Sequence, residues 1–134
     1  MAKFNYKGRK LEELKKLSDE ELMSLMPSNA RRSLKRGQVK KNPALFKKIN
    51  KAIKELSNGE QKTNINTHFR SLVLTPKMVG LTINIHRGNE FRKIVVLEKM
   101  IGQYAGEFVL TRKMVKHSSP GVGASRSSKF IPVK

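Results

Sequence analysis

The feature that most limits how this chain can fold is its ending, EFVLTRKMVKHSSPGVGASRSSKFIPVK, which runs from Glu107 to Lys134. No acidic residue follows Glu107, whereas six Lys and Arg do, together with a Pro-Gly-x-Gly turn. The last residues of this stretch cannot bury enough apolar surface to offset the entropy that is lost on ordering. We therefore expect residues 118–134 to form an extended basic tail that is disordered in the free protein and requires a polyanion beside it.

Net charge indicates what kind of partner this is. The 134 residues include 29 basic and 10 acidic ones, for a formal charge of +19. A compact domain with this much like charge repels itself, so part of its stability should come from a partner that neutralises it. Nucleic acid is the first candidate. A membrane partner is not expected, because interfacial helices need large apolar faces and a spanning helix needs roughly 18 apolar residues, and the sequence has neither.

The first half of the chain predicts short helices. Two are expected between Lys10 and Pro27, the second of them started by a capping box of Ser18 and Glu21. A third is bounded by Ser28, a natural N-cap, and by a glycine stop at position 37. Its basic residues form two adjacent rows without an intervening acid, which favours phosphate contact over a plain solvated face: Arg31 with Lys35, and Arg32 with Arg36.

A longer amphipathic helix is expected after Asn42, which caps it, with Pro43 in its first turn and an end at residues 57–59. Its apolar stripe comprises Leu45, Ile49, Ala52, Ile53 and Leu56. Its opposite face carries mainly lysine, which lacks the planar forks that read base edges, so a helix-turn-helix reader of DNA sequence is not favoured.

From Thr67 the pattern changes to the alternation of β-strands. A strand that contains Ile83 and Ile85, a turn at residues 87–90 and a strand at residues 91–97 predict a hairpin. A third strand around residues 65–74 is expected because an isolated hairpin is rarely stable in water. Two matching segments, TPKMVG and LEKMIG, are expected to form single helical turns on either side of the hairpin.

Together these patterns predict an α+β fold with a small three-stranded sheet and short helices. We divide the chain into a basic helical N-terminal extension over residues 1–60, a compact RNA-binding core over residues 61–117 and the extended tail over residues 118–134.

Catalysis and cofactor binding are not expected. There is no cysteine, and His68, His86 and His117 lie far apart in the sequence without a carboxylate at metal-ligand spacing. A ribonuclease could use two histidines and a lysine, but nothing in the sequence places them together. The segment GVGASRSSK lacks the Gly-Lys-Ser/Thr of a nucleotide-binding loop. Its Gly121 and Gly123 are better interpreted as points where the backbone approaches RNA closely.

The aromatic residues are six Phe and two Tyr, with no Trp, and they are spread along the chain. A base-stacking platform on one strand is therefore not expected. Recognition of phosphates and of the shape of folded RNA is the remaining mode, and it should weaken steeply as salt rises.

Three segments of the chain closely resemble the universal small-ribosomal-subunit protein family nineteen: MVGLTINIHRG, IGQYAGEFVLTR and KHSSPGVGASRSSKFIPVK. The resemblance extends upstream through FNYKG, LEEL and ARRSLKRG, and so covers nearly the whole chain. The N-terminal arm and the SSKF ending are similar to the archaeal and eukaryotic type, with the archaeal type favoured.

The resemblance implies a cytoplasmic, non-enzymatic constituent of the head of the small ribosomal subunit. Its implied partners are small-subunit ribosomal RNA and a neighbouring head protein of family thirteen, with the tail near the decoding region and transfer RNA. Carried onto this sequence, it implies RNA contacts at Arg70, Lys77, Arg87, Arg112, Lys113, Lys116, His117, Arg126 and Lys129.

The basic helix that ends at position 37 forms a second patch of predicted RNA contacts: Arg31, Arg32, Lys35 and Arg36.

The alternatives are a basic RNA chaperone or architectural protein that acts outside the ribosome, and an RNA-processing enzyme that depends on His68 or His117.

Overall fold

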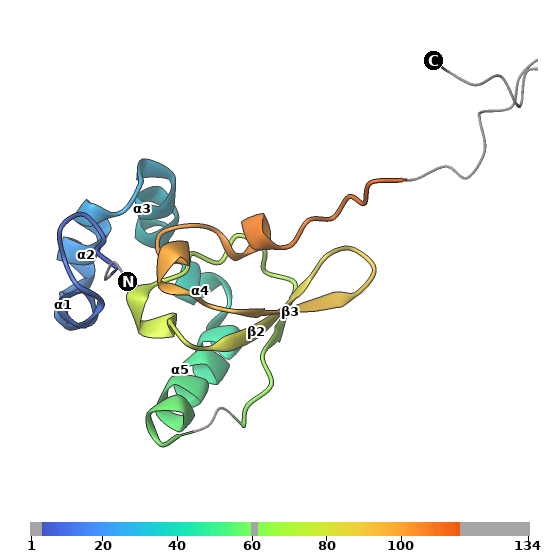
Figure 1. The fold of residues 1–134 in the computed structure, drawn as a ribbon, viewed down its shortest axis with the longest axis horizontal. Coiled ribbons are helices and arrows are strands. Elements are labelled where there is room, and N and C mark those ends of the chain that lie inside the picture. Colours follow the sequence, from blue (N-terminus) through green and yellow to red (C-terminus); the bar gives the residue numbers. More distant parts are fainter. Residues whose placement is uncertain (1–3, 60–61, 116–134) are drawn as a thin grey trace, which may run out of the picture.

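The computed structural model describes residues 4–59 and 62–115 (Figure 1). The expected tail lies outside these residues, so its disorder stays a prediction. Six of the predicted RNA contacts lie outside them as well: Lys116, His117, Gly121, Gly123, Arg126 and Lys129. No helix within the described ranges is long and apolar enough to cross a membrane.

Helices make up the N-terminal half of the described chain: α1 Leu11–Lys16, α2 Asp19–Leu25, α3 Ser28–Lys35, α4 Gln38–Lys41 and α5 Pro43–Ser57. The predicted capping box is confirmed, because the N–H of Glu21 donates to Ser18 Oγ at 3.4 Å and the Glu21 carboxylate accepts from the N–H of Ser18 at 3.3 Å. The prediction that Ser28 is an N-cap is wrong. Pro27 occupies that position with an extended ψ of 153°, so helical geometry begins at Ser28 itself.

The sheet has three strands in the order β1 (Asn66–Thr67), β2 (Thr82–His86) and β3 (Phe91–Val95). Strands β2 and β3 form the predicted antiparallel hairpin, whereas β1 runs parallel to β2. The predicted third strand is therefore present but much shorter than residues 65–74. After Thr67 the chain leaves the sheet in a local turn, in which the N–H of Phe69 donates to Thr67 Oγ1 at 3.0 Å and the N–H of Arg70 to the carbonyl of His68 at 2.9 Å. From Leu72 the backbone bonds to another segment, with the N–H of Ala105 donating to the carbonyl of Leu72 at 2.8 Å.

Single turns of 3-10 helix complete the described chain: η1 Pro76–Met78, η2 Glu98–Met100 and η3 Ala105–Phe108. The first two are the matching turns that TPKMVG and LEKMIG predict. Each is followed by a glycine with positive φ, at 93° for Gly80 and 81° for Gly102.

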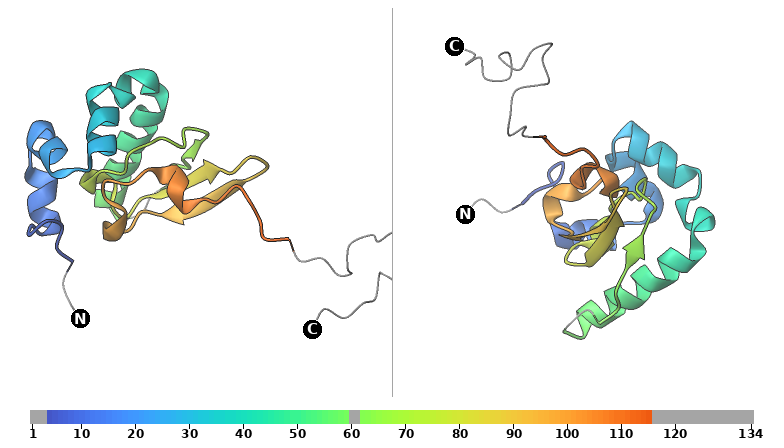
Figure 2. Two further views of the ribbon diagram at one scale, coloured as in Figure 1. Left: turned by 90° about the horizontal axis from the view of Figure 1, so that it is seen from above. Right: turned by 90° about the vertical axis from the view of Figure 1, so that its right-hand side faces the viewer.

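Two apolar clusters hold these elements together. In the larger one, Phe46 and Ile49 of α5 pack with Ile83 and Ile85 from the inner face of β2. Figure 2 shows α5 along one side of the sheet. In the smaller one, buried residues of α1, α2 and α3 pack around Val73 and Ile101. Helix α5, which our division of the sequence assigns to the N-terminal extension, thus shares a hydrophobic core with the sheet.

A buried polar contact also joins α4 to the core. The side chain of Gln38, which is only 2% exposed, accepts from the N–H of Val73 at 3.1 Å and donates to the carbonyl of Val73 at 3.5 Å. These bonds satisfy both backbone groups of Val73 in the interior, as a neighbouring strand would do. Helix α4 is therefore fixed to the core by hydrogen bonds between the Gln38 side chain and the Val73 backbone, in addition to the apolar packing of the neighbouring helices.

Glu55, near the end of α5, holds the chain that enters β1. Its carboxylate accepts from Thr63 Oγ1 at 2.7 Å and from the N–H groups of Thr63 at 2.7 Å and Lys62 at 2.9 Å. The bonds from Thr63, and then the bond from Lys62 and the nearby charge of Lys51, hold the pKa of Glu55 below its ordinary value of 4.5.

Replacement of Glu55 by Gln is expected to remove an acid-sensitive part of the stability. Because the pKa of Glu55 is lower in the folded than in the unfolded chain, the ionised carboxylate stabilises the fold above its unfolded pKa, and this contribution is lost as pH falls through the folded pKa. Urea-unfolding midpoints should show the variant to be less stable at about pH 7, and the gap should shrink towards about pH 3. A gap that stays constant with pH would contradict the expectation.

Candidate nucleic-acid interface

Helix α3 carries exposed cations without partners in the described part of the chain. Arg32, Lys35 and Arg36 are all exposed, and none of them makes a side-chain hydrogen bond or ion pair within residues 4–59 and 62–115. The helix packs on α1 and α2 through the buried side chain of Ala30, which belongs to the smaller apolar cluster. Basic residues in its last turn are favoured by the helix dipole, which offsets part of their mutual repulsion. These three side chains are free to meet a polyanion.

Arg31, the fourth basic residue of α3, has partners within the protein. Its Nε donates to the carbonyl of Met23 and its Nη2 to the carbonyl of Met26, each at 3.2 Å. Helix α2 has no basic residue in its own last turn, so the guanidinium of Arg31 supplies donors to carbonyls at its end. In the predicted row of Arg31 with Lys35, Arg31 therefore makes a structural contact and only Lys35 is an exposed cation.

Arg70 is likewise turned onto the protein backbone. Its Nη1 donates to the carbonyl of His86 at 2.8 Å, and its Nη2 donates to the carbonyls of Gly106 at 2.7 Å and Val109 at 2.6 Å. The half-buried guanidinium thus ties the end of β2 to η3 and to the chain that leads out of the core. This arrangement gives Arg70 a structural role in the described protein.

Two further predicted contacts form ion pairs. Arg87 Nε lies 3.0 Å from Glu90 Oε1, and the Arg87 side chain is only 10% exposed. Lys77 Nζ lies 3.5 Å from Asp19 Oδ1, with both side chains largely in solvent. An exposed pair of the second kind contributes little to stability, so Lys77 can exchange Asp19 for a phosphate at small cost.

A second exposed basic region lies near the point where the described chain ends. Arg112 and Lys113 are exposed on a segment that leaves the core at the same end of the molecule as the tip of the β2–β3 hairpin (Figures 1 and 2). Helix α3 lies towards the other end (Figure 1).

Arg92 and Lys93 of β3 are also exposed, although we did not predict them as contacts. A signal for Lys93 was available in the sequence, because side chains alternate along the predicted strand at residues 91–97 and Lys93 therefore lies on a face of the sheet.

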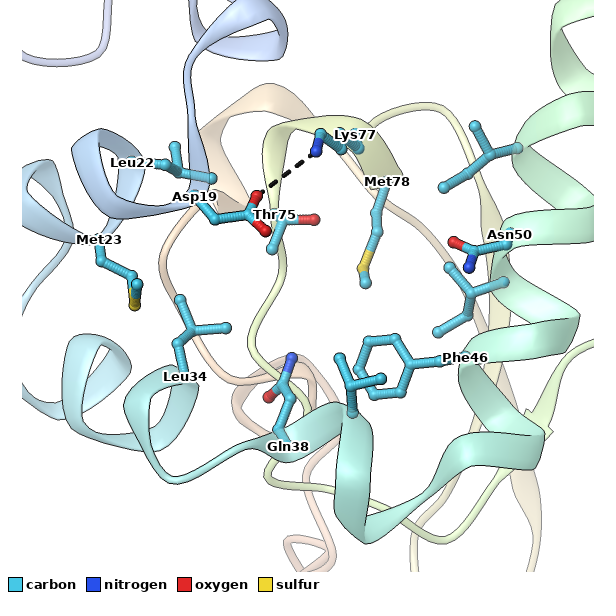
Figure 3. Close-up of a pocket in the computed structure, with 13 residues that line it drawn as sticks. Asp19, Leu22, Met23, Leu34, Gln38, Phe46, Asn50, Thr75, Lys77 and Met78 are labelled. Carbon is cyan, nitrogen blue, oxygen red and sulfur yellow. Dashed lines mark hydrogen bonds and ion pairs between the residues drawn. The ribbon is translucent and has the colours of Figure 1, made fainter.

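A pocket of about 300 Å³ lies between helices α2, α3 and α4 on one side and α5 on the other (Figure 3). Its lining is largely apolar, with Leu34, Phe46 and Met78 around it and the Lys77–Asp19 pair on one side. No histidine lines it, and the described residues contain no group of three or more side chains that could hold a metal ion.

The structure does bring two histidines together, which the sequence had not indicated. The ring centroids of His68 and His86 lie 4.3 Å apart, and the ring of Phe91 lies 5.1 Å from the first and 5.0 Å from the second. His86 Nδ1 accepts a bond from the N–H of Gly88 at 3.1 Å. Among the described residues no carboxylate bonds to either ring.

The fold and these surfaces define a class of protein: a small α+β nucleic-acid-binding protein with exposed cations at both ends of its described part. Comparison with known proteins agrees. The model of the family "Ribosomal protein S19" matches residues 32–117, which is more than half of the chain.

Two curated relatives match almost the whole chain. The small ribosomal subunit protein uS19 of Methanococcus maripaludis is 42% identical over 133 residues, which cover 99% of this chain and 83% of the relative. The uS19 protein of Picrophilus torridus is 46% identical over 131 residues, which cover 98% of this chain and 81% of the relative. The chain belongs to the ribosomal protein S19 family.

Both relatives are archaeal, so the predicted family and its archaeal character are confirmed. Membership of a family of structural ribosomal proteins also confirms the prediction that the chain is not an enzyme.

Proposed function

We propose that this chain is a structural constituent of the small ribosomal subunit in the cytoplasm, where it binds small-subunit ribosomal RNA. The observation that carries the proposal is the match to the S19 family over nearly the whole chain. The net charge of +19, with Arg32, Lys35 and Arg36 of α3 having no partner among the described residues, supplies the physical means, since contacts between such cations and phosphates release counterions.

Within the subunit, we propose a place in the head, beside the small-subunit protein of family thirteen, with the tail near the decoding region and transfer RNA. The exposed side chains of Val95, at the end of β3, and of Leu97, just after it, at 48% and 56%, support contact of this edge with a neighbouring protein. The basic composition of residues 118–134 supports contact with RNA. If fully extended at about 3.3 Å per residue, this segment could reach roughly 55 Å.

The proposal predicts that the protein purifies with small subunits and binds their RNA in preference to other nucleic acids. Its affinity for that RNA should fall by roughly 0.7 to 0.9 log units per log unit of salt for each phosphate contact. Sedimentation of cell extracts and filter binding over a salt series measure both. Equal affinity for unrelated RNA and DNA, together with absence from purified subunits, would favour the alternative of an RNA chaperone outside the ribosome.

A further inference from the structure

The outer face of the sheet carries a ring cluster that the exposed cations do not explain. His68 follows β1, His86 ends β2 and Phe91 begins β3, so three segments contribute one ring each. All three centroid distances lie between 4.3 and 5.1 Å. The cluster is not sealed in the core, because Phe91 is 43% exposed and His68 is also exposed. A strongly basic protein thus keeps an assembled aromatic surface in contact with solvent.

Backbone contacts hold these rings in place. His86 and Phe91 are directly paired in the antiparallel register, and the bond from the N–H of Gly88 to His86 Nδ1 orients the imidazole. Phe91 meets the two histidine rings at 74° and 70°, which is the edge-to-face geometry that aromatic pairs favour. The surface is therefore prearranged, so a ligand that stacks on it has little ordering entropy to overcome.

The same face supplies charge and polar groups beside the rings. Lys93 lies two residues after Phe91 and pairs with Asn84 across the strands, so it shares the face with the rings. The amide of Asn84 donates to the side chains of Asn64 at 2.6 Å and Asn66 at 2.7 Å, which forms a row of amides next to Lys93.

The nearest acid in the sequence, Glu90, is neutralised by Arg87 at 3.0 Å. An anionic ligand on the rings would therefore meet a cation and amides.

We propose that His68, His86 and Phe91 form a stacking site for one unpaired RNA nucleobase, with Lys93 holding an adjacent phosphate. Aromatic and imidazole rings stack on bases of unpaired RNA, and a cation beside them pairs with the backbone. The inference rests on the proposed function, because it assigns one point of contact to the RNA that the protein binds. A neighbouring protein is the competing occupant, and the charge of Lys93 on the same face as Phe91 favours RNA over it.

The test compares two probes of equal charge on the full chain. One is single-stranded hexa-adenylate, and the other is an abasic ribose-phosphate oligomer of the same length. Hexa-adenylate should bind about tenfold more tightly and should move the NMR signals of the three rings, whereas the abasic probe should leave those signals in place. Equal binding of the two probes, with unmoved ring signals, would show that only phosphates are recognised and would overturn the proposal.

Variants then locate the effect. Phe91→Ala and His68→Ala should each reduce the preference for hexa-adenylate to near unity, whereas Phe91→Tyr should retain it. Val95→Ala is the matched control, because Val95 is a similarly exposed residue of β3 whose partner in the register, Thr82, lies at the opposite end of β2 from His86. A loss of preference in Val95→Ala as large as that in Phe91→Ala would count against a site at the rings.

A final measurement uses the assembled particle. Short-wavelength ultraviolet cross-linking of small subunits, followed by mass spectrometry, should find a nucleotide attached to a peptide that contains His68 or Phe91. Ring peptides that cross-link only to another protein would overturn the RNA assignment. Phe91→Ala should still enter small subunits. Failure of the unmodified protein to enter them would instead contradict the proposed function.

Discussion

Replacement of Arg70 by alanine is expected to lower the free energy of unfolding by about 3 kcal/mol, because hydrogen bonds from a charged donor contribute roughly 1.5 to 3 kcal/mol each and are not additive. The guanidinium donates to three backbone carbonyls, which belong to His86, Gly106 and Val109. Alanine would leave all three without that donor. Gly106 shows how closely this region is packed, since a Cβ placed there would lie 2.9 Å from the Cβ of Arg70.

Urea unfolding of the full chain, followed by circular dichroism, measures this effect. Arg70→Lys keeps the charge but not the planar fork, so it should recover only part of the loss. Arg112→Ala is the matched control, since Arg112 is exposed and makes no side-chain bond in the described chain. It should change stability by less than about 0.5 kcal/mol. If Arg70→Ala kept full stability but lost affinity for RNA, Arg70 would be an RNA contact, as the family resemblance implies.

Reversal of the exposed charges of α3, in the triple variant Arg32→Glu, Lys35→Glu and Arg36→Glu, is expected to weaken binding to small-subunit RNA by about a hundredfold or more at low salt. The plot of log affinity against log salt should become less steep by about two to three units, because each lost phosphate contact removes roughly 0.7 to 0.9 of a unit. Arg31 is left in place because its guanidinium bonds to carbonyls at the end of α2. Filter binding over a salt series gives both quantities.

A second triple variant separates position from net charge. Lys47, Lys48 and Lys54 are exposed on α5, and their replacement by Glu changes the net charge by the same amount. If α3 contacts phosphates, its reversal should have the larger effect on the salt dependence, with both variants folded by circular dichroism. Equal losses in the two variants would mean that total charge alone matters, and α3 would then be no specific contact.

Much of the local structure could be predicted from the sequence, because it depends on residues close together in the chain. The capping box of Ser18 and Glu21, the apolar stripe of α5 and the glycine-terminated turns each involve a few neighbouring positions. The hairpin follows from alternation over two short strands and the turn between them. The single turn α4 between Gly37 and Asn42 was not predicted, and its buried Gln38 bonds to a segment 35 residues away.

The sequence by itself determined the charge, the partner class and the family, because net charge, the acid-free ending and the motifs need no coordinates. Only the tertiary structure decided which cations are free. Arg31 and Arg70 look as available as Arg32 and Arg112 in the sequence, yet their guanidinium groups bond to backbone carbonyls. The tertiary structure also brings the rings of His68, His86 and Phe91 together. The physical reason is that side-chain partners depend on contacts between distant segments, which local periodicity does not encode.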